Sequence, residues 1–329
     1  MSTSVEEDGF LECFFILLCT RSFQVIGGVA LGMDTIAKLF LTGFTTTALL
    51  GPLVGNWVDK YGRKKGSMAF ALFYTAAALA VCSNNLAVLF AGRIAGGIGT
   101  SLLFSAPEAW FVGEAGRGAF SGAFLGRTFG LAYFGDSIAA MTAGQVAQAS
   151  ANVAGPTAPF VASTLCLGLG ALIASICWAE NKADRSSSEA SSTKGGEEEA
   201  SKSSGSGGGI RRAAEAMAAD PKIMCVGAVQ SLFEGAMYIF VLQWPNALRA
   251  VLSGSAAVPF GKVFSCFMAS CMLGSSLFPA IANRGVRVED SAPLMLGLAA
   301  TAMASAAAFG TTGLAALAGA FFAFEACVG

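Results

Sequence analysis

The fold is decided by the stretch GNWVDKYGRKK (55–65), a short basic segment that separates two long apolar runs. Within it, Gly55 permits a close contact between helices and Gly62 permits a tight turn. Asp59 lies at the predicted end of the first run, where it can pair with Arg63 or with a helix terminus. A helix needs about 20 mostly apolar residues to cross a bilayer. The stretch therefore predicts a basic turn between two membrane-spanning helices.

Apolar runs of spanning length recur along the whole chain. Hydrophobic residues make up 54% of the 329 residues and charged residues 12%, about half the charge of a soluble protein. A net charge of -1 gives no basic surface for nucleic acid, which we do not expect as a partner. We predict an all-α polytopic membrane protein with about nine to ten transmembrane helices. The candidate spans are residues 10–31, 35–58, 66–84, 86–107, 119–148, 157–179, 223–247, 259–283, 291–311 and 313–329.

The cysteine and histidine counts limit the kinds of metal and catalytic site that the chain can form. The chain has nine Cys and no His. The cysteines lack the paired spacing of a zinc site, and nothing indicates a disulfide framework. Without His, catalytic triads and histidine metal sites are excluded. No nucleophile–base pair or phosphate loop is evident either, so we expect neither an enzyme nor a resident metal or organic cofactor.

One polar segment divides the chain. Residues 181–222 are rich in Ser, Gly and Glu and contain no aromatic residue, a composition typical of disorder. We interpret this segment as a linker between an N-terminal bundle (1–180) and a C-terminal bundle (223–329). Lys and Arg are concentrated in this linker and in the loops at 59–66 and 283–288. The positive-inside rule then predicts that the N-terminus and the linker are cytoplasmic.

Two pieces of the chain recur at a nearly constant offset. LLGPLVGNWVDKYG (49–62) aligns with MLGSSLFPAIANRG (272–285), and FSAPEA (104–109) aligns with FFAFEA (321–326). The second alignment matches Glu108 to Glu325. Recurrence in the same order on both sides of the linker favours two homologous bundles, an architecture typical of transporters.

The motif Gly55, Asp59, Gly62, Arg63, Lys64 resembles the loop motif of the major facilitator superfamily, which implies a conformational latch. A plain positive-inside loop is the alternative interpretation. Four further runs look like the molybdate-anion transporter branch of that superfamily: IAKLFLTGF (36–44), GRIAGGIGTSLLFSAPEAW (92–110), SLFEGAMYIFVLQW (231–244) and FMASCMLGSSLF (267–278). The resemblance implies twelve spans, so we expect two more than this chain carries. It also implies uptake of molybdate across the plasma membrane.

Molybdate is a tetrahedral dianion, and binding it requires fixed positive charge or aimed hydrogen-bond donors. The resemblance directs us first to Arg93 and Arg127, with Lys38 third, because the planar guanidinium fork bonds two oxygens at once. Arg93 is alternatively a residue that reaches the membrane interface. The hydroxyls of Thr100, Ser101 and Ser105 are further predicted donors. Tyr238 and Trp244 are candidates to line the cavity, although aromatic residues near span ends are more often interfacial anchors.

Four carboxyl groups fall inside predicted spans or, for Glu108, one residue beyond the end of one: Glu108, Glu234, Glu325 and Asp136. An ionisable group at the centre of a span costs about 2.5–3.5 kcal/mol on insertion scales. A carboxylate does not hold a dianion, but a protonated one can carry a co-transported proton while the anion loads. The alternative role is structural, in which these groups pair with Arg or with helix ends.

We therefore interpret the chain as a multi-pass carrier that takes up molybdate by alternating access within a lipid bilayer, with protein partners left open. A second hypothesis keeps the fold and changes the cargo to sulfate, another small anion or an organic solute. A third makes the chain a transport-incompetent membrane scaffold or sensor that uses its linker for interactions.

Overall fold

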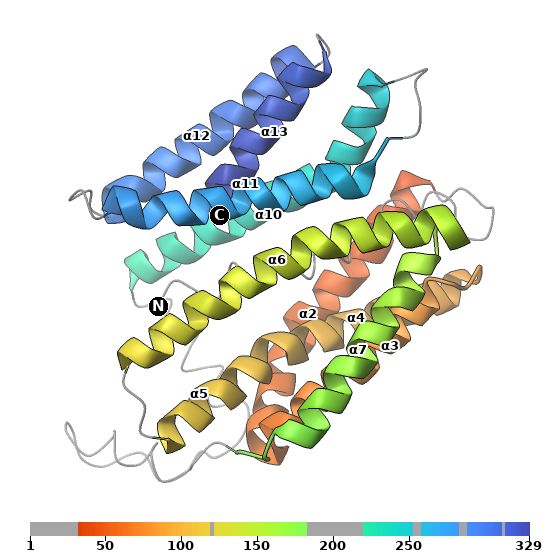
Figure 1. Cartoon of the computed structure of the whole chain (residues 1–329), viewed down its shortest axis with the longest axis vertical. Coiled ribbons are helices and arrows are strands. Elements are labelled where there is room, and N and C mark those ends of the chain that lie inside the picture. Colours follow the sequence, from red (N-terminus) through yellow and green to blue (C-terminus); the bar gives the residue numbers. More distant parts are fainter. Residues whose placement is uncertain (1–31, 119–121, 183–219, 253–257, 283–287, 311–312) are drawn as a thin grey trace. The chain divides into compact units, whose positions relative to one another are not determined.

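The structure of the chain is a computed structural model that describes residues 32–118, 122–182, 220–252, 258–282, 288–310 and 313–329. The predicted span at 10–31, most of the predicted linker and the loop at 283–287 lie outside these residues. The described residues are predominantly helical and contain no strand, which confirms the all-α prediction (Figure 1).

The nine other predicted spans coincide with helices, to within a few residues at their ends. The helices are α2 (Met33–Tyr61), α3 (Arg63–Ala80), α4 (Leu86–Ser105), α5 (Pro107–Arg117), α6 (Gly122–Ala154), α7 (Ala158–Cys177), α10 (Pro221–Val251), α11 (Phe260–Ala282), α12 (Val288–Phe309) and α13 (Leu314–Val328). Helix α5 was not predicted. It begins with Pro107 at the first helical position, where the missing N–H costs nothing.

Several helices are long and apolar enough to cross a membrane. Among the described residues they are Asp34–Tyr61, Leu86–Arg117, Ala158–Cys177, Pro221–Val251 and Phe260–Leu277. The segment Leu86–Arg117 joins α4 and α5 into one rod, interrupted only at Ala106. Shorter apolar helices occur at Pro293–Phe309 and Leu314–Val328.

Helices α2, α3 and α4 form a triplet in which α4 packs against both of the others. Small residues allow this close approach, as is common between helices in lipid. A Cβ added at Gly97 would lie 2.7 Å from the carbonyl oxygen of Gly43, so α2 and α4 are in backbone contact there. The hydroxyl of Thr47 donates to the Gly97 carbonyl oxygen at 3.2 Å across the same contact. Position 97 therefore has no room for a side chain.

Helices α11, α12 and α13 repeat this pattern, because α13 packs against both α11 and α12 (Figure 1). Here too a glycine allows the contact: a Cβ at Gly274 of α11 would clash with the Ala326 carbonyl of α13. The repeat inferred from the sequence pairs α2 with α11 and α4 with α13, and the packing pattern recurs accordingly.

Aromatic rings fill the core beside the second triplet. Phe240 of α10 lies against Phe267, Phe321 and Phe324, with ring centroids 4.9–5.7 Å apart. Trp244, one turn further along α10, packs edge-on against Phe267 at 5.1 Å and is almost completely buried. This burial corrects the expectation that Trp244 lines a cavity, because its ring surface is taken up by other rings.

Helices α6 and α11 meet along a polar seam. A Cβ at Gly144 would lie 2.9 Å from the Gly261 carbonyl oxygen, so the two backbones touch. Beside this contact, the amide of Gln145 donates to the Ser265 hydroxyl at 2.7 Å, and Ser265 donates to the Met141 carbonyl at 2.8 Å. The bonds satisfy polar groups that lipid cannot solvate.

By the density of internal contacts, the described residues divide into two compact units. One holds residues 126–159 and 232–329, and the other holds residues 32–125 and 160–231 outside the undescribed gaps. The predicted division of the chain into bundles at 1–180 and 223–329, joined by the linker 181–222, stays a prediction.

Candidate functional site

Among the described residues, Arg93 is the charged residue that the fold buries inside a helix of spanning length. It lies on α4, on the side that faces α2, and only 8% of the residue is exposed. The central carbon of its guanidinium lies 5.2 Å from the centroid of the Phe40 ring on α2. Its aliphatic stem lies beside Gly43, where an added Cβ would be 3.9 Å from the Arg93 Cδ. The Phe40 ring is thus the contact that α2 makes with the charged group.

The three predicted hydroxyls lie further along the same helix. Thr100 shares a hydrogen bond of 2.8 Å with the hydroxyl of Tyr74 on α3. Ser101 donates to the Gly97 carbonyl oxygen at 3.0 Å, and Ser105 donates to the Ser101 carbonyl oxygen. At about 1.5 Å of rise per residue, they lie roughly 10–18 Å along the axis from Arg93. The structure therefore does not gather them with Arg93 into one pocket.

The other predicted contacts lie on other helices. Lys38 is exposed near the start of α2, where its ammonium pairs with Asp34 at 2.6 Å. Arg127 lies in α6, but its side chain is outside the described part of the structure. Tyr238 is half-buried on α10. Arg127 and Tyr238 belong to the unit that does not contain Arg93.

The four predicted carboxyl groups differ in burial. Glu325 on α13 is buried, with 7% exposed, and within the described residues no ion pair or hydrogen bond joins its carboxyl group. Glu108 in the first turn of α5, Glu234 on α10 and Asp136 on α6 are half-buried. An unpaired carboxylate in an apolar interior is costly, which makes Glu325 the residue of this group that most needs explanation.

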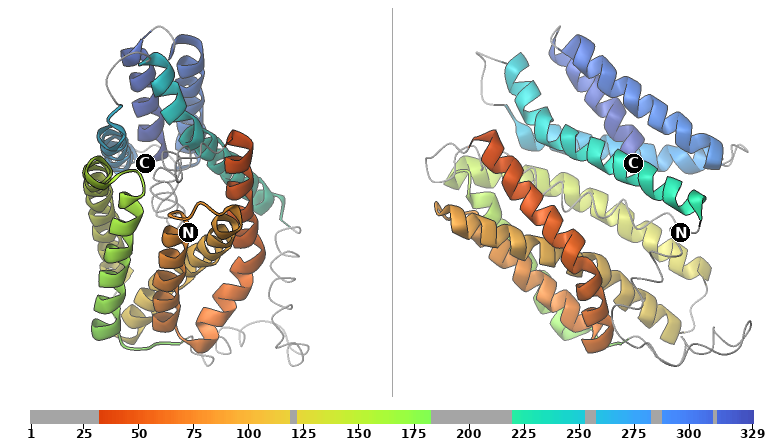
Figure 2. Two further views of the ribbon diagram at one scale, coloured as in Figure 1. Left: turned by 90° about the vertical axis from the view of Figure 1, so that its right-hand side faces the viewer. Right: turned by 180° about the vertical axis from the view of Figure 1, so that it is seen from behind.

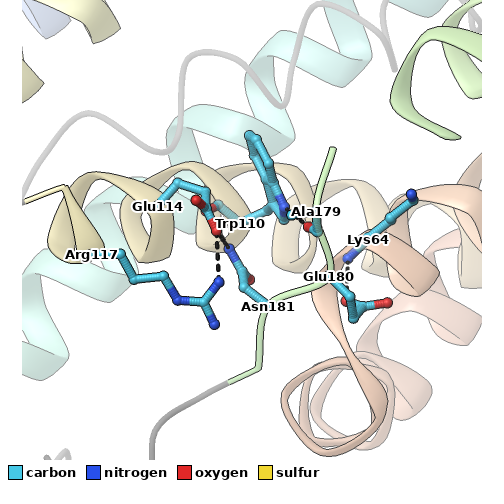
Figure 3. Close-up of polar contacts among 7 residues, drawn as sticks. All are labelled: Lys64, Trp110, Glu114, Arg117, Ala179, Glu180 and Asn181. Atoms are coloured by element: carbon cyan, nitrogen blue, oxygen red, sulfur yellow. Dashed lines mark hydrogen bonds and ion pairs between the residues drawn. The ribbon is translucent and has the colours of Figure 1, made fainter. Parts of the chain in front are cut away.

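The loop motif forms the most extensive polar network in the described chain (Figure 3). Gly62 has φ +128°, a backbone conformation that favours glycine, and a Cβ there would clash with the Glu180 carboxylate. Asp59 and Arg63 form an ion pair at 3.6 Å. Gly55 has open space around it, and Lys64 points to the end of α7.

A short segment after α7, Trp178–Lys182, docks on this loop, and we name it the strap. Helix α3 begins at Arg63 after a glycine that offers no capping side chain, so its first N–H groups need outside partners. The strap supplies them: the Arg63 N–H donates to the Asn181 carbonyl oxygen at 3.0 Å, and the Lys64 N–H donates to the Glu180 carboxylate at 3.0 Å. A carboxylate at a helix N-terminus is also favoured by the helix dipole.

The side chain of Lys64 in turn caps the C-terminal end of helix α7. Its ammonium donates to the carbonyl oxygens of Ser175 and Trp178, both at 2.8 Å, at the C-terminal end of α7. A cation there satisfies carbonyls that have no partner within the helix. The loop and the strap therefore cap each other's helices.

Helix α5 holds the strap from the other side (Figure 3). The ring of Trp110 stacks on Trp178 at 4.1 Å between centroids, and its N–H donates to the Ala179 carbonyl oxygen at 2.7 Å. The Asn181 side-chain amide donates to the Trp110 carbonyl oxygen and to the Glu114 carboxylate, both at 3.0 Å. Asn181, expected to open the linker, is instead 1% exposed and belongs to this network.

Sequence reasoning placed the motif residues but missed their partners Trp110, Trp178, Glu180 and Asn181. One signal was available, because the chain has only four Trp and one of them, Trp178, lies three residues before the polar segment.

Helices of spanning length, a buried arginine within one of them and a basic loop capped by a strap define a polytopic membrane protein. A family model described as sugar transporters with 12 TM helices matches residues 23–328. The chain therefore belongs to this family of the major facilitator superfamily, as its sequence motifs predicted.

Individual relatives show which transporters within the superfamily the chain is similar to. The chain is 33% identical over 252 residues to the molybdate-anion transporter of Takifugu rubripes, which covers 74% of this chain and 52% of the relative. It is 29% identical over 270 residues to that of Xenopus tropicalis, covering 80% and 54%. The transporter of Danio rerio is 29% identical over 273 residues, covering 80% and 56%. The chain thus spans about half the length of the curated relatives it matches.

Proposed function

We propose that the chain carries molybdate across a membrane by alternating access, with its N-terminal and C-terminal bundles moving about a site near the bilayer midplane. The observation that carries the proposal is Arg93, a buried guanidinium in a helix of spanning length. The similarity to molybdate-anion transporters supplies the cargo. Molybdate is cargo here, and the proposal needs no resident metal or organic cofactor and no catalytic step.

The chemistry of Arg93 suits an oxyanion. Phe40 engages the guanidinium through a cation–π contact, which involves the flat face of the group. The N–H groups lie in the plane of the guanidinium and form a fork that matches two oxygens of a tetrahedral anion. Low exposure strengthens the attraction between the charge and an anion that reaches it. Arg127, Tyr238 and the hydroxyls of α4 are the other contacts predicted from the sequence, and the proposal does not depend on their lying beside Arg93.

We further propose that a proton accompanies the anion. Glu325 is the leading carrier because it is buried and within the described residues has no cation beside it. Glu108, Glu234 and Asp136 are the other candidates. Protonation of a buried carboxyl group removes a negative charge that would repel a dianion. The competing role, in which these carboxyls fix helix register, predicts that neutral replacements alter stability without altering the proton dependence of uptake.

The proposed setting is the plasma membrane, with the N-terminus and the central linker in the cytoplasm. Lys64 of the loop motif contacts the strap and the end of α7, so the basic loop and the start of the linker lie close together. This proximity supports placing both on one side of the membrane. In this orientation the loop motif acts as the cytoplasmic latch.

Molybdate uptake by cells that express the full chain tests the proposal. Arg93→Ala and Arg93→Lys should each reduce uptake at least tenfold at equal membrane abundance, because Lys keeps the charge and loses the fork. Arg249→Ala is the matched control, since Arg249 also lies over an aromatic ring, Phe260, at 5.1 Å. We expect it to retain uptake.

Three results would refute parts of this proposal. Full uptake by Arg93→Lys would show that bidentate binding of the anion by the guanidinium is not needed. Competition by sulfate as strong as competition by tungstate favours another anion as cargo. A chain that reaches the membrane and moves no molybdate favours the scaffold hypothesis.

A further inference from the structure

We infer that an anionic phospholipid binds at the end of α2 that carries the loop motif, on a surface formed by Trp57, Lys60, Tyr61 and Lys65, here named the headgroup surface. The inference goes beyond the proposed function and does not depend on it, because it concerns the outer face of the helices and not the cargo.

The first observation is the order of residues along one stripe of α2. Leu49, Leu53, Trp57 and Tyr61 recur every fourth residue and are each between 41% and 70% exposed. In the right-hand view of Figure 2, α2 lies in front of the other helices of its unit. The rings of Trp57 and Tyr61 lie 5.5 Å apart. The stripe thus passes from leucine to paired aromatics to the lysine beside Tyr61, which is the order of hydrocarbon, interface and headgroup in a leaflet.

The second observation is which cations the protein uses internally. Arg63 pairs with Asp59, and Lys64 caps α7 through two carbonyl oxygens. Lys60 and Lys65 are exposed, and among the residues described neither ammonium pairs with a carboxylate. The ammonium of Lys60 lies 5.3 Å from the centroid of the Tyr61 ring. Two of the four cations therefore remain available to a partner outside the chain.

Helix α3 carries a second exposed stripe that begins at the same loop. Lys65, Leu72 and Leu79 are spaced by seven residues and so lie on one face, and all three are exposed. A second apolar stripe thus also ends in a lysine at the loop. The two stripes offer acyl chains two apolar tracks and a headgroup two ammonium groups.

Charge selects the class of lipid. A zwitterionic headgroup carries its own ammonium beside the phosphate, whereas an anionic headgroup has net negative charge to match Lys60 and Lys65. Each lysine near a membrane surface favours anionic lipid by about fivefold, so the pair should favour it by about 25-fold.

Tryptophan fluorescence with brominated lipids tests the inference. The full chain is reconstituted in vesicles that contain a low fraction of either brominated phosphatidylglycerol or brominated phosphatidylcholine. Trp57 is exposed, so the quenched signal is assigned as the part lost in Trp57→Phe. We expect half-maximal quenching of Trp57 at a roughly 25-fold lower fraction of phosphatidylglycerol, and near-equal fractions in the variant with both Lys60→Gln and Lys65→Gln.

Lys38→Gln is the matched control, because Lys38 is an exposed lysine near the other end of α2 and pairs with Asp34. It should keep the full preference. The inference is overturned if neither lipid quenches Trp57, since the stripe then does not face lipid. It is also overturned if both lipids quench equally, or if Lys38→Gln lowers the preference as much as the double variant.

Discussion

Asn181→Ala should open the strap while leaving the rest of the unit folded. The side-chain amide of Asn181 donates two hydrogen bonds at 3.0 Å, one to the Trp110 carbonyl oxygen and one to the Glu114 carboxylate. A neutral hydrogen bond contributes about 1 kcal/mol and one to a charged group about 1.5–3 kcal/mol. The side-chain oxygen Oδ1 of Asn181 is buried without a partner, so removing it offsets part of this loss. We expect a net loss of about 2 kcal/mol.

Amide hydrogen exchange measures this loss of strap stability directly. The N–H groups of Arg63 and Lys64 open α3, so their protection depends on the strap and not on the helix. A loss of about 2 kcal/mol should raise their exchange rates roughly thirtyfold. Asn85→Ala is the control: Asn85 caps α4 by accepting from the Ala87 N–H at 2.9 Å, so its effect should stay at the start of α4.

Unchanged exchange at Arg63 and Lys64 in a folded Asn181→Ala variant would refute the reasoning, because the amide would then contribute nothing to docking. Equal acceleration by Asn85→Ala would also refute it, since the loss would be global and not local to the strap.

Three further predictions concern other parts of the chain. Gly97→Ala should lower the thermal stability in detergent by about 1–3 kcal/mol, since its Cβ would lie 2.7 Å from Gly43 oxygen, whereas Gly96→Ala, with its Cβ 3.7 Å from the nearest atom, should be neutral. Tyr74→Phe should cost about 1 kcal/mol in the same melt by removing the bond to Thr100, and an unchanged melting temperature would contradict this. Cys82 lies in the turn after α3, and burial raises its thiol pKa above its ordinary value. The reactive thiolate is therefore scarce at neutral pH. A membrane-impermeant maleimide should label Cys82 from outside intact cells, faster as the pH rises, and Cys82→Ala should lose this labelling. Labelling of Cys82 only after permeabilisation would reverse the proposed orientation.

Hydropathy was sufficient to predict the helices because lipid imposes length and apolarity on each span separately. It placed α2 and α11 to within a few residues. It missed α5, whose charged residues Glu108, Glu114 and Arg117 reduce its apolarity.

The candidate site was less predictable, because its contacts join residues far apart in the sequence. A lone Arg in an apolar run indicates a functional residue, and Arg93 is indeed buried. Nothing local shows that Ser101 and Ser105 donate to their own helix. The bonds of Lys64 with residues more than 100 positions away depend on the path of α7, which no spacing rule encodes.

The rod Leu86–Arg117 carries both the strap contact and the buried arginine. Trp110, held by the strap, and Arg93 lie on it about 25 Å from each other at 1.5 Å per residue. Over that length, a tilt of about 10° centred on the strap would displace the Arg93 end by roughly 4 Å, more than the length of a hydrogen bond. The strap contact at Trp110 therefore constrains the position of Arg93 through the helix backbone alone.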